Sequence, residues 1–291
     1  MDTRLIRPDS MEEALSERQK YGSDAMPIAG GQSLLVLLRN KLVDPKILID
    51  LERLAELRGL QHQANGISIG AMTTIYTLAS SADIAAPLGE AAAKVGSTAI
   101  RNLGTIGGNV CHNELGADPP PSLLVLNAVA ELRSKNGTRK VPLGEFFRSY
   151  FETAVAPEEL LCRIEVPVLP SGAAGVYLKH AISSEDLAIA GVAVVLIPDG
   201  NKGGAVREVR IGLGGVAPVP FRAAKAEKTL AGAVLKDEAI REAAEIASSE
   251  ADPMTDPHAS ADYRRKMVKV LVRRAIVAAK QQLERKGNGK T

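Results

Sequence analysis

This chain is poor in aromatic residues and in cysteine. Aromatic residues make up 3% of its 291 residues, and tryptophan is absent. Proteins that bind bases by stacking need a platform of such rings, so no nucleic-acid partner is expected. The two cysteines, Cys111 and Cys162, are too few for a disulfide scaffold or for the four ligands of an iron–sulfur cluster.

Strong charge and long apolar runs are also absent. The formal net charge of +2 gives no electrostatic reason to expect nucleic acid. The longest apolar run, residues 187–197, is too short to span a bilayer and predicts a buried strand. The first eight residues lack the apolar core of a signal peptide, so a cytoplasmic protein with no transmembrane segment is expected.

Two glycine-rich segments are the most informative features present. The first spans residues 29–34 (AGGQSL) and the second spans residues 101–109 (RNLGTIGGN). Glycine lets a ligand approach the main chain, and successive N–H groups can form a concavity that suits phosphate oxygens. Two such segments predict a long diphosphate cofactor held at two points, although a plain turn remains an alternative for the first.

The spacing within these segments narrows the ligand class. The first lacks both the Gly-x-Gly-x-x-Gly fingerprint and the Lys-Ser/Thr end of a P-loop, which disfavours NAD on a doubly wound sheet and disfavours ATP. In the second, Thr105 and Asn109 flank Ile106-Gly107-Gly108 and can add side-chain hydrogen bonds. Asp118 precedes three prolines, where it is either a turn or cap residue or an acceptor for a ligand hydroxyl or ring N–H.

The remaining pattern predicts an α+β chain. Residues 25–51 resemble a strand–loop–helix–strand unit, helices are expected over 71–80 and 88–95, and Asn136-Gly137 predicts a hairpin. Three strands are expected over 176–181, 187–197 and 206–213, followed by helices. The last helix, 262–283, has one apolar stripe. We expect domains over 1–170 (lobes of about 1–55 and 56–170) and 175–285, with a disordered tail over 286–291.

Several reactive or charged residues favour a structural interpretation. No metal-ligand spacing relates the four histidines, which are His62, His112, His180 and His258. Cys111 lies beside His112, but adjacent residues rarely form a productive pair, so an inert packed thiol is expected. A basic stripe on the last helix predicts a solvated face, with a docking surface as the alternative, and comprises Arg264, Arg265, Lys269, Arg273 and Arg274.

Taken together, the two glycine-rich segments and Ala117-Asp118 resemble the flavoprotein (medium) subunit of the xanthine oxidase family of molybdenum hydroxylases. The layout is most similar to the medium subunits of bacterial carbon monoxide dehydrogenase. The resemblance covers nearly the whole chain and includes residues 260–275 of the last helix. It implies FAD as the cofactor, no metal, a two-lobed FAD-binding region of the vanillyl-alcohol oxidase-like (PCMH-type) fold, and a C-terminal three-stranded sheet with a helical bundle.

The resemblance also implies which residues contact FAD. The first segment would wrap the diphosphate, through Ile28, Ala29, Gly30, Gly31, Gln32, Ser33 and Leu34. The diphosphate, ribityl or adenosine parts would be held by Thr105, Ile106, Gly107, Gly108, Asn109 and Asp118. Ile69 matches a position that packs on the flavin, and Leu161 and Lys179 match positions near the isoalloxazine ring.

The implied function is electron relay within an oxidoreductase complex. An iron–sulfur small subunit and a molybdopterin large subunit would be the partners, as a dimer of heterotrimers, and no catalytic residue is expected in this chain. Two other readings stay open from the residues: a stand-alone flavin-dependent reductase or oxidase, and a non-catalytic nucleotide-binding module. Neither the substrate nor the electron acceptor follows from the sequence.

Overall fold

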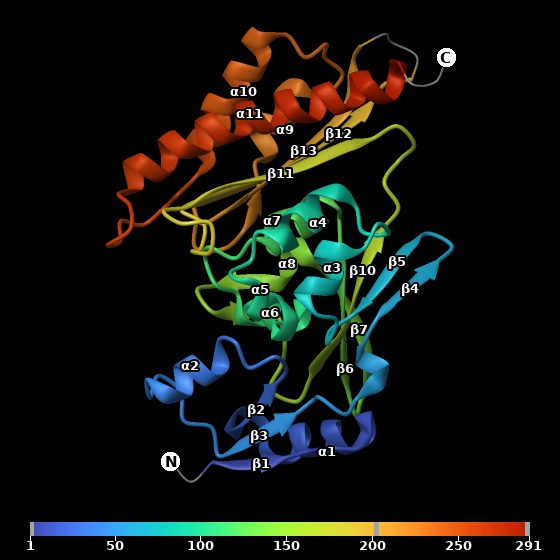
Figure 1. The fold of residues 1–291 in the computed structure, drawn as a ribbon, viewed down its shortest axis with the longest axis vertical. Helices are drawn as coiled ribbons and strands as arrows, with labels where there is room; N and C mark the ends of the chain where they lie inside the picture. The colour runs from blue at the N-terminus through green and yellow to red at the C-terminus, as the bar shows by residue number, and fades with distance from the viewer. Residues whose placement is uncertain (1–2, 201–203, 289–291) are drawn as a thin grey trace. The chain divides into compact units, whose positions relative to one another are not determined.

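The computed structural model describes residues 3–200 and 204–288, which are arranged in two compact units (Figure 1). Unit 1 contains the segments Met1–Thr77, Ser97–Asn113 and Ala128–Pro167, and unit 2 contains Leu78–Gly96, Glu114–Asn127 and Val168–Thr291. The units therefore alternate along the chain. The division into domains near residue 170 remains a prediction.

Unit 1 begins with a parallel sheet of order β1-β3-β2 that supports the first glycine-rich segment. Helix α1 (Met11–Tyr21) has Ser10 as its N-cap, and the Ser10 Oγ accepts a hydrogen bond from the Glu13 N–H. Its apolar face belongs to the same core cluster as buried residues of β3. The strands are β1 (Arg4–Ile6), β2 (Ala25–Ile28) and β3 (Ile47–Asp50).

The second sheet of unit 1 is antiparallel, with order β4-β5-β10-β6-β7. The predicted hairpin is confirmed as β6 and β7, which pair from Val129 with Pro142 to Ser134 with Gly137. Strand β4 was not expected, because its sequence LQHQ has no apolar alternation. The strands are β4 (Leu60–Gln63), β5 (Gly66–Gly70), β6 (Val129–Ser134), β7 (Gly137–Pro142) and β10 (Leu160–Pro167). Shorter elements follow β7: α8 (Leu143–Phe146), β8 (Phe147–Ser149) and β9 (Glu152–Thr153).

Short helices surround the glycine-rich segments. Helix α2 (Leu34–Arg39) follows the first segment as predicted. The second segment is not one continuous loop: it is the end of α5 (Thr98–Leu103), a two-residue connection, and the start of α6 (Ile106–His112). The helix predicted over 71–80 begins only at α3 (Ile75–Ser80), because the Ala71 and Met72 N–H groups donate to the backbone of Cys162 and Leu57.

Unit 2 is built on an antiparallel sheet of order β11-β12-β13-β14. The three predicted strands are present, and a two-residue fourth strand, β14 (Phe221–Arg222), corrects the expectation of a three-stranded sheet. Strand β12 starts later than predicted, since Leu187 lies in an exposed loop. The longer strands are β11 (Ala174–His180), β12 (Ala190–Pro198) and β13 (Val206–Gly214).

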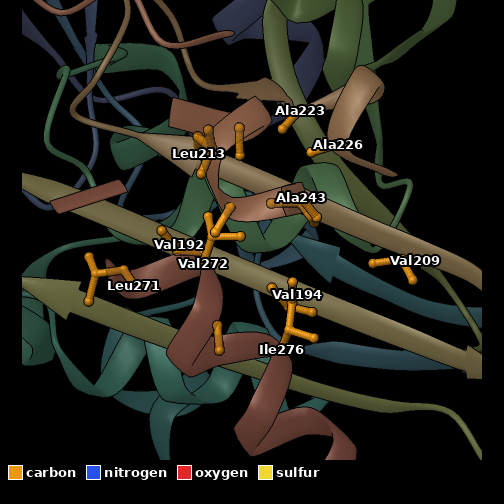
Figure 2. Close-up of a cluster of buried hydrophobic side chains, with 14 of the residues drawn as sticks. Val192, Val194, Val209, Leu213, Ala223, Ala226, Ala243, Leu271, Val272 and Ile276 are labelled. Carbon is orange, nitrogen blue, oxygen red and sulfur yellow. The ribbon is translucent and has the colours of Figure 1, made fainter. Parts of the chain in front are cut away.

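Helices cover both faces of this sheet, so the whole of β12 is buried apart from its last residue. Helices α4 (Ala86–Ala93) and α7 (Pro119–Val125) pack on one face. The other face packs against α9 (Ala224–Leu230) and α11 (Ala261–Asn288), and α10 (Asp237–Glu250) packs on these two helices. Figure 2 shows the resulting core, in which Val192 and Val194 of β12 meet Val272 and Ile276 of α11.

Helix α11 confirms one prediction and corrects two others. All of its predicted apolar stripe is buried or half-buried. Arg264 was expected on a solvated basic face, but it is buried. The helix continues to Asn288, so a disordered tail from residue 286 was wrong for residues 286–288, while residues 289–291 lie outside the described part. Within the described residues, no helix is both long and apolar enough to cross a membrane.

Candidate functional site

The first glycine-rich segment connects β2 to α2 in unit 1 and is braced by close backbone packing. A Cβ on Gly30 would lie 1.9 Å from the carbonyl oxygen of Leu103, so only glycine fits there. Gly31 has φ of +69°, which glycine adopts without strain. The Gln32 side-chain amide donates to the Gly30 carbonyl at 2.9 Å and fixes the turn from within.

The backbone N–H groups of this segment are available to a ligand. From Gly30 to Leu34, no N–H donates to an acceptor within the described residues, and Leu35 is the first residue whose N–H finds one, at the Gly31 carbonyl. Consecutive N–H groups in a tight turn attract anions, because each bears a partial positive charge. The first segment therefore has the donor set that a diphosphate requires.

The second glycine-rich segment differs, because its N–H groups are already bonded. The Thr105 hydroxyl caps α6 by accepting from the Gly108 N–H at 3.1 Å. Ile106 donates to the Thr73 carbonyl, Gly107 donates to the Ala71 carbonyl at 2.8 Å, and Asn109 donates to the Thr105 carbonyl. The first turn of α6 thus offers no free backbone donor among these residues.

The glycines of the second segment have separate roles. A Cβ on Gly107 would lie 2.6 Å from the Ala71 Cβ, so this glycine lets α6 pack against the chain that follows β5. Gly108 is exposed, and a Cβ there would meet only the Thr105 hydroxyl, at 3.0 Å, and the Ala29 side chain, at 3.8 Å. Gly108 is therefore the glycine of this segment at which a bound group could lie against the main chain.

Asn109 supplies the one polar group in this turn that lacks a partner. Its side-chain Oδ1 is buried and accepts no hydrogen bond within the described residues. Buried polar atoms are almost always bonded, and an exception points to a ligand or a water. A hydroxyl or amino group of a nucleotide would satisfy this oxygen.

Asp118 lies in unit 2, where it forms a buried polar cluster. Its Oδ1 accepts from the Tyr177 hydroxyl at 2.7 Å, and its Oδ2 accepts from the Lys179 ammonium at 2.9 Å. Lys179 also donates to the Lys94 carbonyl at 2.9 Å. Burial raises the pKa of Asp118 to about 6, although Lys179 and Tyr177 favour its charged form. Burial also raises the pKa of Tyr177, so its hydroxyl stays a donor.

The pairing of Asp118 with Lys179 joins two residues that the sequence proposed separately. Tyr177, the third member, was missed. It is 59 positions from Asp118 in the chain, and β11 has no pattern that distinguishes a buried hydroxyl donor from an ordinary core tyrosine. The alternation of β11, with Tyr177 and Lys179 on the same face, is the only signal that could have linked them.

Ile69 and Leu161 are buried side chains of the antiparallel sheet in unit 1, on β5 and β10. Ile69 is opposite Ile164, and Leu161 is opposite Leu132. Both therefore contribute to the core in this structure, and their contact with a flavin remains a prediction.

Cys111 and His112 end α6 in unit 1. Burial raises the pKa of the Cys111 thiol to about 12, which agrees with an unreactive thiol. The His112 ring contacts the ring of Phe151 at 5.4 Å between centroids. In the described part of the chain, no group of three or more His, Cys, Asp or Glu side chains could hold a metal ion.

Two family models match this chain. Residues 1–169 match the FAD binding domain in molybdopterin dehydrogenase, and residues 176–279 match the CO dehydrogenase flavoprotein C-terminal domain. The chain belongs to this family of FAD-binding subunits. As a medium subunit of the molybdenum hydroxylases, it has FAD as its cofactor and is an electron-transfer component of an oxidoreductase complex.

Similar proteins align with this chain over nearly its full length. The carbon monoxide dehydrogenase medium chain of Afipia carboxidovorans is 36% identical over 94% of this chain and 95% of its own. The glyceraldehyde dehydrogenase medium chain of Sulfolobus acidocaldarius is 36% identical over 93% of this chain and 96% of its own. The solved carbon monoxide dehydrogenase from Hydrogenophaga pseudoflava superposes with a TM-score of 0.93, at 36% identity, over 97% of this chain and 98% of that chain. The α+β fold is thereby confirmed.

The residues present fit FAD in this medium subunit. The free N–H groups of residues 30–34 suit the diphosphate, and the unpartnered Asn109 Oδ1 suits a hydroxyl or amino group of the nucleotide. When bound, FAD supplies the exchange between one-electron and two-electron chemistry, which no side chain of this protein provides.

Proposed function

We propose that the FAD diphosphate binds to the N–H groups from Gly30 to Leu34 in unit 1. The single observation that supports this is the run of backbone donors with no acceptor in the described chain. Ile28 and Ala29 precede this turn, and Gly31 has the left-handed backbone conformation that is common in anion-binding turns.

The second segment would contact a different part of the cofactor. Because its N–H groups bond within unit 1, we assign it Gly108 as the surface against which the nucleotide lies and Asn109 as a side-chain acceptor. Thr105, Ile106 and Gly107 would act indirectly, by fixing the start of α6.

Asp118, Lys179, Ile69 and Leu161 are proposed to lie near the flavin ring or the ribityl chain. Lys179 has three N–H donors, of which Asp118 and the Lys94 carbonyl use two, so one is left for a flavin acceptor. Asp118 would position Lys179 and keep its charge compensated. This assignment makes Asp118 a positioning residue for FAD.

Within the complex, the chain would relay electrons from an iron–sulfur small subunit to an external acceptor, with a molybdopterin large subunit oxidising the substrate. We propose a cytoplasmic dimer of heterotrimers, and a division of the chain into an FAD-binding domain (1–170) and a C-terminal domain (175–285). The task of this chain is to hold FAD and to set its surroundings, since it offers no group that could take electrons from an organic substrate.

Purification of the chain with its neighbours tests this proposal. We expect the chain to co-purify with two other subunits and with molybdenum, and to release FAD on acid precipitation. We also expect the isolated chain to oxidise no organic substrate. Substrate-driven bleaching of the flavin by the isolated chain would contradict the relay and favour a stand-alone reductase or oxidase. Retention of the flavin in the acid precipitate, or release of FMN, would contradict non-covalently bound FAD.

A further inference from the structure

Tyr177 is a buried residue of β11 whose hydroxyl is directed at the polar cluster of unit 2. It is 1% exposed, and its hydroxyl donates to the Asp118 Oδ1 at 2.7 Å. The alternation of β11 places Tyr177 and Lys179 on the same face of the strand, while Val176 contributes to the apolar core on the other face. The Tyr177 hydroxyl and the Lys179 ammonium therefore reach Asp118 from the same strand face.

The neighbouring strand makes room for this hydroxyl. Gly191 of β12 pairs with Lys179, and a Cβ on Gly191 would lie 2.5 Å from the Tyr177 hydroxyl oxygen. Because the phenol ring is buried, it has no free space into which it could turn away from such a contact. Alanine at residue 191 would therefore displace the hydroxyl from Asp118.

The backbone of Tyr177 is held in place as well. Strand β11 is an edge strand of its sheet. The Tyr177 N–H donates to the Glu90 carboxylate of α4 at 2.6 Å instead of to another strand. Both the ring and the main chain of Tyr177 are thus fixed by neighbours within unit 2.

Stability alone does not explain a tyrosine beside a glycine at this place. Burial of a hydroxyl costs free energy that its hydrogen bond offsets, and a glycine inside a strand weakens the strand because it has no side chain to pack. Phenylalanine beside alanine would fill the same space without either cost. The pair of Tyr177 and Gly191 therefore points to a site where polar groups are held in place for a ligand.

We propose that Tyr177 is a positioning residue for the flavin. Its hydroxyl bonds to one oxygen of Asp118 and fixes the carboxylate. The other oxygen then holds the Lys179 ammonium, which keeps a third N–H for a flavin acceptor. Gly191 permits this arrangement, since it leaves space for the hydroxyl. The proposal rests on the proposed function, because it takes Lys179 as a flavin contact.

The charged groups around Asp118 give this arrangement a measurable property. Burial raises the pKa of Asp118 to about 6, while Lys179 and Tyr177 of β11 and Lys94 after α4 favour its charged form. None of the residues of β12, all of which are described, is titratable, and Arg210 of β13 donates to a carbonyl at the other end of α7. Loss of the Tyr177 hydroxyl should raise the pKa of Asp118 further, because the carboxylate then loses one of its donors.

The test is a pH titration of Asp118 and of FAD binding in the full chain. Tyr177→Phe removes only the hydroxyl, and Gly191→Ala displaces it by another route. We expect each variant to raise the pKa of Asp118 by about one unit or more, as followed by carboxyl ¹³C NMR of aspartate-labelled protein. Asp118→Asn identifies the signal. FAD affinity at about pH 6.5 should fall by about tenfold in each variant, and the loss should be smaller at about pH 8.5.

Tyr263→Phe is the matched control, because it removes another tyrosine hydroxyl of unit 2, one that bonds to His180. It should leave the pKa of Asp118 and the FAD affinity at their wild-type values. In the double variant, Gly191→Ala should add little to Tyr177→Phe, since the oxygen that its Cβ would strike is gone. General damage to the sheet would instead make the two effects additive.

Three results would overturn the proposal: an unchanged pKa of Asp118 in Tyr177→Phe, a raised pKa with wild-type FAD affinity, or additive losses in the double variant. Lys179→Met separates this inference from the proposed function. If Lys179→Met binds FAD as wild type does, Lys179 is not a flavin contact, and the proposed function is wrong at this residue. If Lys179→Met weakens FAD binding and Tyr177→Phe does not, only the positioning role is wrong.

Discussion

The two glycine-rich segments of unit 1 look alike in sequence and differ in what their backbones do. From Gly30 to Leu34 the N–H groups have no acceptor in the described chain, while from Ile106 to Asn109 every N–H is bonded to unit 1 itself. The first segment is therefore a donor surface, and the second is a packed helix start. Glycine in the first segment lets a ligand approach the main chain, whereas Gly107 in the second segment lets another stretch of the same chain pack against it.

This difference shows that glycine content alone does not identify a phosphate site. The distinguishing property is whether the backbone N–H groups have acceptors within the protein. Those acceptors lie far away in the sequence, such as the Ala71 and Thr73 carbonyls for α6. Four substitutions sharpen the comparison, beginning with the change that should disturb the molecule most.

The largest effect is expected from Gly30→Val. The new side chain would meet the Leu103 carbonyl oxygen at 1.9 Å, and a backbone atom cannot rotate away. We expect the free energy of unfolding to fall by about 3 kcal/mol or more, with loss of bound FAD. Thermal unfolding and the flavin-to-protein ratio measure both. Gly144→Val is the matched control, because nothing lies within 4 Å of a Cβ there; equal damage by both variants would refute the packing argument.

Gly107→Ala comes next and should act on stability. Its Cβ would lie 2.6 Å from the Ala71 Cβ and 2.7 Å from the Ala71 carbonyl oxygen. We expect a loss of about 1–3 kcal/mol in urea unfolding of the apoprotein. A variant with wild-type stability and weak FAD binding would show instead that Gly107 faces the cofactor.

Gly108→Val should show the opposite pattern. Gly108 is exposed, and the nearest atom to its new Cβ is the Thr105 hydroxyl at 3.0 Å, so the fold should persist. We expect FAD affinity to fall by about tenfold or more, because the side chain occupies the surface assigned to the nucleotide. Titration of apoprotein with FAD decides this. Unchanged affinity would remove Gly108 from the site.

The last comparison is a gradual pH dependence and concerns Asp118, the polar residue that follows the second segment. Its pKa of about 6 in the folded protein exceeds the ordinary value of 3.8. Between these values the folded protein binds a proton that the unfolded chain has released, so this contribution to stability falls as pH rises from about 4 to about 6. The slope is at most about 1.4 kcal/mol per pH unit, and it is absent above that window.

Asp118→Asn removes this titration and serves as the comparison. The free energy of unfolding of wild type minus that of the variant should decrease from pH 4 to pH 6 and then stay constant. A difference that does not change with pH would mean that the Lys179 ammonium keeps Asp118 ionised throughout.

Much of the fold was predictable because its signals are local. The N-cap of α1, the β6–β7 hairpin and the apolar stripe of α11 each depend on residues within one or two turns of one another. The glycines at 30, 31, 107 and 108 also stand out in the sequence. What they do was not predictable, because Leu103 and Ala71 determine it through the tertiary structure. The Tyr177–Asp118–Lys179 cluster and the burial of Arg264 were hidden for the same reason.

Amide hydrogen exchange of the apoprotein and of the FAD-loaded protein tests the central claim most directly. If the first segment is the diphosphate site, the amides from Gly30 to Leu34 exchange fast in the apoprotein and slow markedly when FAD binds. The amides from Ile106 to Asn109 should be protected in both states, because unit 1 already bonds them. Unchanged exchange over residues 30–34, with new protection confined to residues 106–109, would contradict this account.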